Sequence, residues 1–247
     1  MIADPATPGY GVSLKNAAFS VGGKVILEGI TTDLTEQRIG IVGRNGSGKT
    51  TLLRLIAGLI EPTQGVIRVD GIDPARDRKA ILSTLGILFQ NPDHQILFPT
   101  VEEELAFGLL QMGQAKAEAR EAVASMLAAE GRSHWAKAST NTLSQGQRHY
   151  LNLLSILLMK PRIILLDEPF AGLDLPTQIR LTRRLAALPQ RLVTISHDPH
   201  AVTGCQRILW IEGGRIRRDG PAAEVVAEFT ADMMERGEQD ADTDLAD

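Results

Sequence analysis

The sequence predicts an α/β fold built on an open sheet, and three observations lead to that class. Short apolar runs at 39–42, 163–166 and 192–195 alternate with helical stretches along the chain. Polar residues follow these runs directly, at the strand ends where open α/β sheets bind ligands. A glycine-rich octapeptide joins the first run to a helix. The sequence therefore predicts alternating strands and helices with a ligand-binding edge.

The first third of the chain predicts β structure interrupted by one helix. Residues 11–42 contain short strand-like runs between turn residues, and Gly22-Gly23 resembles a hairpin turn. The other elements expected in this part are one helix and two strands, at 51–57, 66–71 and 85–89 respectively.

From about residue 92 the composition favours helices, because alanine is dense and glycine is sparse. We expect helices at 101–110 and 115–130, and Ser144 is placed to cap a further helix that begins near Gln147. Strands and a helix then alternate again and end in a hairpin, with expected ranges 163–166, 176–188, 192–195 and 208–218.

Bulk properties exclude several classes of protein. The 247-residue chain has a net charge of −4, which gives no electrostatic support to a nucleic-acid partner. The single cysteine, Cys205, excludes a disulfide framework within one chain. The most apolar stretch, 151–159, is far shorter than the ~20 residues of a membrane span. Residues 235–247 carry six acids and one base, which predicts a disordered tail.

The glycine-rich octapeptide predicts a phosphate-binding loop. Its glycines let backbone N–H groups turn toward an anion, and the following helix adds a positive N-terminal dipole. Lys49 is expected to reach the β and γ phosphates, and Thr50 to offer its hydroxyl to Mg²⁺. The predicted nucleotide-binding residues are Gly43, Arg44, Asn45, Gly46, Ser47, Gly48, Lys49, Thr50 and Thr51.

Two acids follow the strand expected at 163–166. Asp167 can hold Mg²⁺, and Glu168 can polarise an attacking water. Considered alone, the Asp167-Glu168 pair is equally consistent with two solvated acids in a turn. Together with the phosphate loop, the pair predicts nucleotide hydrolysis.

The hexapeptide Leu-Ser-Gln-Gly-Gln-Arg at 143–148 is a third motif. With the first two, the chain resembles the nucleotide-binding subunit of ABC transporters over about residues 11–230. The family signature is Leu-Ser-Gly-Gly-Gln, so Gln145 replaces the first glycine, and we expect this change to tune contacts rather than abolish them. The signature acts on the nucleotide of a second subunit, which implies that role here for Ser144, Gln145, Gly146 and Gln147.

The resemblance also implies the layout of the chain. We expect a P-loop NTPase fold with a RecA-like mixed-sheet core, an antiparallel β subdomain and an inserted α-helical subdomain at about 92–160. These parts would form a single ABC domain at 1–234, followed by the acidic tail at 235–247.

Further positions match the family one by one. Gln90 resembles the Q-loop glutamine, which contacts Mg²⁺ and the membrane partner, and Asp174 resembles the D-loop aspartate. His197 resembles the switch histidine. The resemblance thus implies Glu168, His197 and Gln90 as catalytic residues and Thr50, Gln90 and Asp167 as Mg²⁺ ligands. The four other histidines, His94, His134, His149 and His200, are expected at the surface or in local hydrogen bonds.

The adenine contact departs from the family. Val21 stands where the family commonly stacks the base on a tyrosine, and Phe19 is the nearest aromatic substitute. The sequence therefore leaves open whether GTP is accepted as well as ATP.

Residues 90–108 resemble the extended Q-loop of the ATPase subunits of energy-coupling factor (ECF) importers. The resemblance implies a second ATPase subunit, with a homodimer favoured, plus a transmembrane coupling protein and a substrate-capture protein. It places the chain peripherally, on the cytoplasmic face of the membrane. Residues 34–43 look most like the biotin-transporter branch, with cobalt or nickel uptake as the close alternative.

Two other interpretations remain at this stage. A soluble ABC-type ATPase of DNA repair or translation would share the three motifs, but would be expected to carry a coiled-coil insertion or a second cassette. A catalytically inactive module would be expected to lack Lys49, Glu168 or His197, and all three are present.

Overall fold

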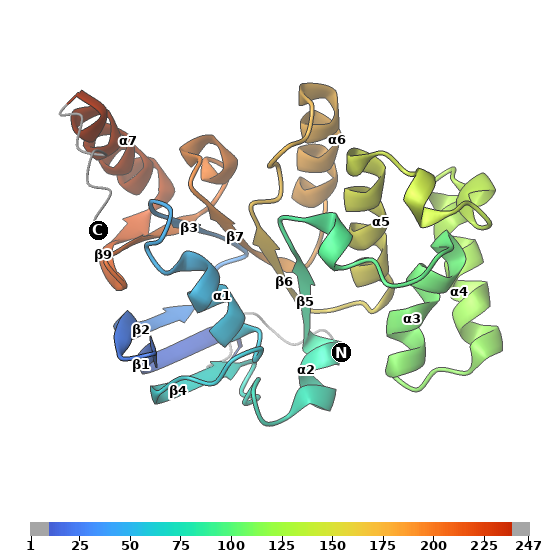
Figure 1. Cartoon of the computed structure of the whole chain (residues 1–247), viewed down its shortest axis with the longest axis horizontal. Helices are drawn as coiled ribbons and strands as arrows, with labels where there is room; N and C mark the ends of the chain where they lie inside the picture. Colours follow the sequence, from blue (N-terminus) through green and yellow to red (C-terminus); the bar gives the residue numbers. More distant parts are fainter. Residues whose placement is uncertain (1–9, 239–247) are drawn as a thin grey trace.

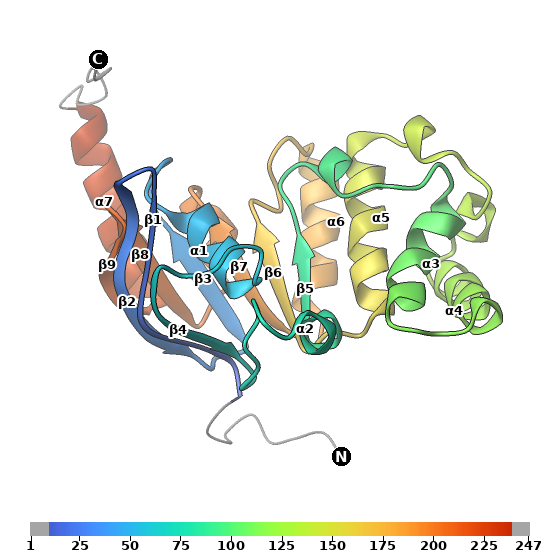
Figure 2. The same cartoon turned by 60° about the horizontal axis from the view of Figure 1, so that its bottom comes forward.

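The computed structural model describes residues 10–238 and contains two sheets. The smaller sheet is antiparallel, in the order β2-β1-β4 (Figures 1 and 2). The expected hairpin turn at Gly22-Gly23 joins its first two strands, and both glycines have positive φ angles, 57° and 79°. Its strands are β1 (Val12–Val21), β2 (Lys24–Leu34) and β4 (Gln64–Val69).

The larger sheet has six strands in the order β5-β6-β7-β3-β8-β9, and only its last pair, β8 and β9, is antiparallel. This is the expected mixed-sheet core. The strands are β3 (Arg38–Val42), β5 (Leu85–Leu88), β6 (Ile163–Asp167), β7 (Arg191–Ser196), β8 (Arg207–Glu212) and β9 (Arg215–Pro221).

Helices complete the core on both faces of this sheet. Helix α1 (Lys49–Ile56) shares one buried apolar cluster with both sheets. Helix α6 (Leu175–Ala186) packs with β6 and β7 in a second cluster. Helix α7 (Ala222–Glu238) covers β8, where Phe229 meets Trp210 edge-on at 5.3 Å between ring centroids.

The segment between β5 and β6 forms a helical subdomain with a buried cluster of its own (right-hand side of Figure 1). The expected helices at 101–110 and 115–130 are present within one residue at each end. The elements are η1 (Pro92–His94), α3 (Val101–Gln111), α4 (Lys116–Ala129), η2 (Ser133–Trp135), η3 (Thr140–Thr142) and α5 (Gln145–Leu158).

Two helices were missed by the sequence analysis, α2 (Arg78–Thr84) and α7, and a short η4 (Pro199–Val202) follows β7. Helix α7 also corrects the expected start of the acidic tail, because it runs four residues past 234. Arg236 stabilises this last turn through Asp232, one helical turn earlier, and through Glu212 on β8. The rest of the expected tail, 239–247, lies outside the described residues.

Candidate nucleotide-binding site

Four neighbouring strands of the larger sheet end at one edge, and the predicted site residues follow them. The order β5-β6-β7-β3 places Gln90, the Asp167-Glu168 pair, His197 and the phosphate loop side by side. The register aligns these ends, since Asp167 pairs with Ile195 and Val42 with Ser196. The strand order, which cannot be read from the sequence, thus assembles one site from four distant segments.

The phosphate loop needs its glycines for conformation and for space. Gly46 and Gly48 have φ angles of 77° and 106°, and Gly48 begins helix α1. A Cβ at Gly48 would lie 2.7 Å from a methyl group of Leu27. The hydroxyl of Ser47 is buried and, among the described residues, has no hydrogen-bond partner. A polar cradle of this kind fits a phosphate group.

Lys49 lies inside this loop. Its ammonium donates to the carbonyl oxygens of Gly43 at 2.6 Å and Arg44 at 2.8 Å, and the residue is 6% exposed. Burial lowers the pKa of Lys49, while Glu168 and Asp167 act in the opposite direction. The loop therefore holds a buried positive charge next to two carboxylates.

Asp167 ends β6 and is 7% exposed. Burial raises its pKa, Glu168 adds to this effect, and Lys49 and Arg54 oppose it. A carboxylate that burial disfavours in its ionised form fits a bound cation. Within residues 10–238 no group of three or more His, Cys, Asp or Glu side chains could hold a metal. The donors fit Mg²⁺, which commonly uses one or two carboxylates together with substrate phosphates.

Glu168 is held by Ser196, the last residue of β7, and by His197, which follows it. Its backbone has a φ angle of 47°, which is uncommon for a residue with a side chain. One carboxylate oxygen accepts from the Ser196 hydroxyl at 2.6 Å. The other accepts from the backbone N–H of His197 and meets the His197 Nδ1, both at 2.8 Å. A cavity of about 360 Å³ opens beside Glu168 and His197, on the side of the D-loop. Ser196 was missed by the sequence analysis.

The signature hexapeptide forms the start of α5. Ser144 caps this helix as expected, because its Oγ accepts a hydrogen bond from Gln147 N at 3.3 Å. In return, Gln147 Oε1 accepts from Ser144 N at 2.8 Å, which completes the capping box. The helix begins at Gln145, two residues before the expected start. Figure 1 shows α5 beyond β6 and β5, whereas α1 follows β3. The signature therefore lies apart from the phosphate loop of its own chain.

Comparison with known proteins decides the family. The sequence pattern described as ABC transporter matches residues 27–171, more than half of the chain. This chain belongs to the ABC transporter family. It is an ATPase subunit of that family, as the resemblance had indicated.

A biotin transport ATP-binding protein, BioM, from Rhodobacter capsulatus is 53% identical over 86% of this chain and 91% of its own length. Among solved structures, CbiO1 from Clostridium perfringens, part of the ABC transporter complex CbiONQ, has a TM-score of 0.77 at 28% identity and covers 92% of this chain and 94% of its own. The dimeric ATP-binding cassette MJ0796, bound to ADP and phosphate, has a TM-score of 0.72 at 27% identity, with coverages of 85% and 98%.

The Q-loop of this ABC subunit is tied to the signature helix. Gln90 is exposed at the end of the β5 segment. Beyond it, Asp93 pairs with Arg148 at 2.5 Å, and Asn152, fully buried on α5, donates to the Pro92 carbonyl at 3.1 Å. Arg148 and Asn152 were not predicted as functional. Their contacts join the Q-loop to the helix that begins with the signature.

The D-loop also contacts the signature within the chain. Asp174 caps α6 by accepting from Thr177 N at 3.1 Å. Gly172 has a φ angle of 70°, and a Cβ there would lie 2.7 Å from Gln145 Nε2. The Gln145 that departs from the family signature therefore covers a D-loop glycine.

The remaining predicted residues are the two candidates for the adenine contact, Phe19 and Val21. Phe19 is half-buried and packs against the main apolar core, so its ring is occupied by the protein interior. Val21 is 60% exposed at the end of the hairpin. Of the two, only Val21 has most of its surface exposed, and its contact with the base remains a prediction.

The expectation for His149 was wrong. This residue is 1% exposed, and neither ring nitrogen has a hydrogen-bond partner in the described part of the chain. The misjudgement has a physical cause. His149 follows the signature on the face of α5 that meets α6, and only the helix packing reveals that face.

Proposed function

We propose that this chain is the ATP-hydrolysing subunit of an ECF-type importer and that biotin is the cargo. The observation that carries the proposal is the assembly of the phosphate loop, Asp167, Glu168 and His197 at one sheet edge. The 53% identity to a biotin transport ATP-binding protein supports the cargo.

Each site residue has a role that follows from its position. The loop amides and Lys49 bind the phosphates and stabilise the charge that develops on the transferring phosphoryl group. Glu168, oriented by Ser196 and His197, accepts a hydrogen bond from the attacking water. His197 uses Nδ1 toward Glu168, which leaves Nε2 free for the γ phosphate or the water. Mg²⁺, held by Thr50 and Asp167 with Gln90 nearby, supplies further charge neutralisation when bound.

A second copy of this chain completes the site. The signature lies apart from the phosphate loop of the same chain, so a facing subunit must present Ser144, Gln145, Gly146 and Gln147 to the nucleotide. One sequence carries both halves, which favours a homodimer with two competent sites. The similarity to a dimeric cassette bound to ADP and phosphate supports this arrangement.

Membrane partners would supply the transport path. No helix within residues 10–238 has the length and apolar character to cross a bilayer. The Q-loop segment exposes Leu97 at 66%, next to the Phe98–Phe107 ring contact. We assign this surface to the coupling protein, and the chain to the cytoplasmic face of the membrane. A small substrate-capture protein completes the importer.

Co-purification tests this assembly. A tagged chain is isolated from gently solubilised native membranes, and the proteins that accompany it are identified by mass spectrometry. We expect a coupling protein and a capture protein that binds biotin. A capture protein that binds cobalt or nickel would overturn the cargo, and recovery of the soluble chain alone would overturn the transport role.

A further inference from the structure

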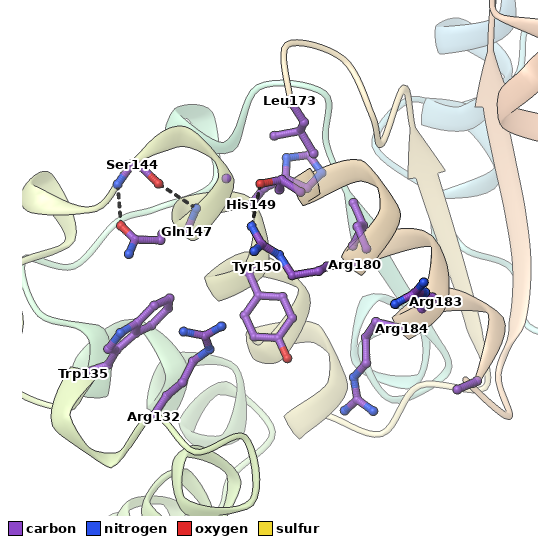
Figure 3. Close-up of a pocket in the computed structure, with 14 residues that line it drawn as sticks. Arg132, Trp135, Ser144, Gln147, His149, Tyr150, Leu173, Arg180, Arg183 and Arg184 are labelled. Carbon is purple, nitrogen blue, oxygen red and sulfur yellow. Dashed lines mark hydrogen bonds between the residues drawn. The ribbon is translucent and has the colours of Figure 1, made fainter. Parts of the chain in front are cut away.

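A cavity of about 560 Å³ lies beside the signature, between α5, α6 and the segment at 132–135. Its size falls in the range of small-molecule sites, about 300–1,000 Å³. Figure 3 shows Arg132 and Trp135 on one side, three arginines of α6 on the other, and Tyr150 between them. The ATPase mechanism uses none of these six side chains.

The lining is strongly basic. Four arginines face the cavity, and no aspartate or glutamate is among the residues that line it. Glu130, behind the wall, pairs with one of them, Arg184, at 2.7 Å. In the described part of the chain the other three have no ion-pair partner, and Arg180 only donates to the Thr177 hydroxyl. The four are Arg132, Arg180, Arg183 and Arg184. Such a cluster favours an anionic ligand.

Several buried polar atoms in this wall are unpaired. The Nε atoms of Arg132 and Arg184 have no hydrogen-bond partner among the described residues. Both ring nitrogens of His149, which also lines the cavity, are equally unpaired, and burial lowers its pKa to about 4. A neutral imidazole provides one donor and one acceptor. Because unpaired buried polar groups destabilise a protein, these atoms point to a ligand with oxygen atoms.

The cavity also presents flat surfaces. The guanidinium of Arg132 lies 4.4 Å from the ring centroid of Trp135 and 5.1 Å from that of Tyr150. The Tyr150 hydroxyl donates to Glu130, which fixes the ring. Trp135 itself is only 6% exposed, so the half-buried Arg132 guanidinium and Tyr150 ring are the flat groups that a planar ligand can reach.

We propose that this cavity is a ligand site for a small organic anion, consisting of a planar ring that carries a phosphate or carboxylate group. The ring lies against the Arg132 guanidinium and Tyr150, and the anionic group meets Arg180 and Arg183. The site is separate from the phosphate loop of the same chain. Ser144 and Gln147 form part of its wall, so a ligand there touches the signature.

Phenyl phosphate is a suitable probe, because it combines one ring with one phosphate. Binding to the full-length chain is followed by tryptophan fluorescence, with Trp135→Phe to confirm the reporter, and by calorimetry. We expect saturable binding that weakens at least about tenfold in Arg180→Ala/Arg183→Ala, since charge-assisted contacts are lost. Both arginines are exposed, so the double variant is expected to fold, which circular dichroism checks.

Two controls locate the site. Arg76→Ala removes an arginine that is 83% exposed and remote from the cavity, and should leave binding unchanged. Lys49→Ala disables the phosphate loop and should also leave binding of the probe unchanged. Equal binding by wild type and the double arginine variant, loss of binding in Lys49→Ala, or no saturable binding would each overturn the proposal.

Discussion

Glu168 is the residue on which hydrolysis depends most directly. Its backbone is in the left-handed conformation, and three contacts from Ser196 and His197 orient its carboxylate before a nucleotide arrives. Strain of this kind is typical of functional positions.

We predict that Glu168→Gln loses ATP turnover by about 10²-fold or more, the usual contribution of a group that activates a water. Nucleotide binding should persist, because the loop and Lys49 remain. Phosphate release measures turnover, and a fluorescent ATP analogue measures binding. Turnover equal to that of wild type would remove Glu168 from the mechanism.

Ser196 is a positioning residue. Ser196→Ala removes the hydrogen bond to Glu168 and is predicted to lower kcat by about fivefold to tenfold, corresponding to about 1 kcal/mol. KM for ATP should change little. Thr203→Ala, which removes a hydroxyl bonded to the His200 carbonyl, is the matched control. A drop in kcat of the same size in both variants would contradict the role.

Asp167 links function to stability. Its folded pKa lies above the ordinary value of 3.8, so the folded state binds its proton more tightly than the unfolded state. Ionised Asp167 therefore destabilises the apo protein at neutral pH, and this cost disappears as pH falls to the ordinary carboxyl range. Asp167→Asn should raise the Tm of the nucleotide-free chain at pH 7, and the rise in Tm should be smaller at acidic pH. An unchanged or lower Tm at pH 7 would contradict this prediction.

At the scale of elements, the signature and the D-loop form one contact through Gln145 and Gly172. Gly172→Ala forces a side chain into a left-handed conformation and against Gln145, at a cost of about 1–2 kcal/mol for the backbone alone. We predict a lower Tm and lower turnover. Adding Gln145→Gly should restore part of the Tm loss, because the side-chain contact disappears while the backbone strain remains.

Gln145→Gly alone serves as the control for that pair. This variant should change ATP turnover only modestly, since Gln145 adjusts the contact between the signature and the D-loop without being essential to it. A gain of several hundredfold would show instead that Gln145 impairs the signature.

The elements also show which parts of the structure the sequence could predict. Apolar runs with polar ends predicted β6 and β7, and the Ser144 cap predicted the start of α5 within two residues. Helix α7 was missed because its buried contacts, Val225 and Phe229 against β8, depend on tertiary packing. The sequence pattern also could not predict the burial of His149, because that burial depends on which face α5 turns toward α6.

For the whole molecule, the motifs predicted the family and the fold class, and the comparisons confirmed both. The roles of the individual site residues remain predictions. Strand order explains why motifs far apart in sequence meet, since β7 lies between β3 and β6 and brings His197 to the phosphate loop and Glu168. The arginine-lined cavity had no sequence signal, because its walls come from three segments that only the fold brings together.

Uptake of labelled biotin tests the central claim most directly. Cells that lack the chromosomal gene for this chain receive wild type, Glu168→Gln or Lys49→Ala at matched levels, and biotin and cobalt uptake are measured side by side. The account predicts that wild type restores biotin uptake and that both variants fail, with cobalt uptake unaffected. Biotin uptake that is independent of this chain, or equal with all three versions, would contradict it.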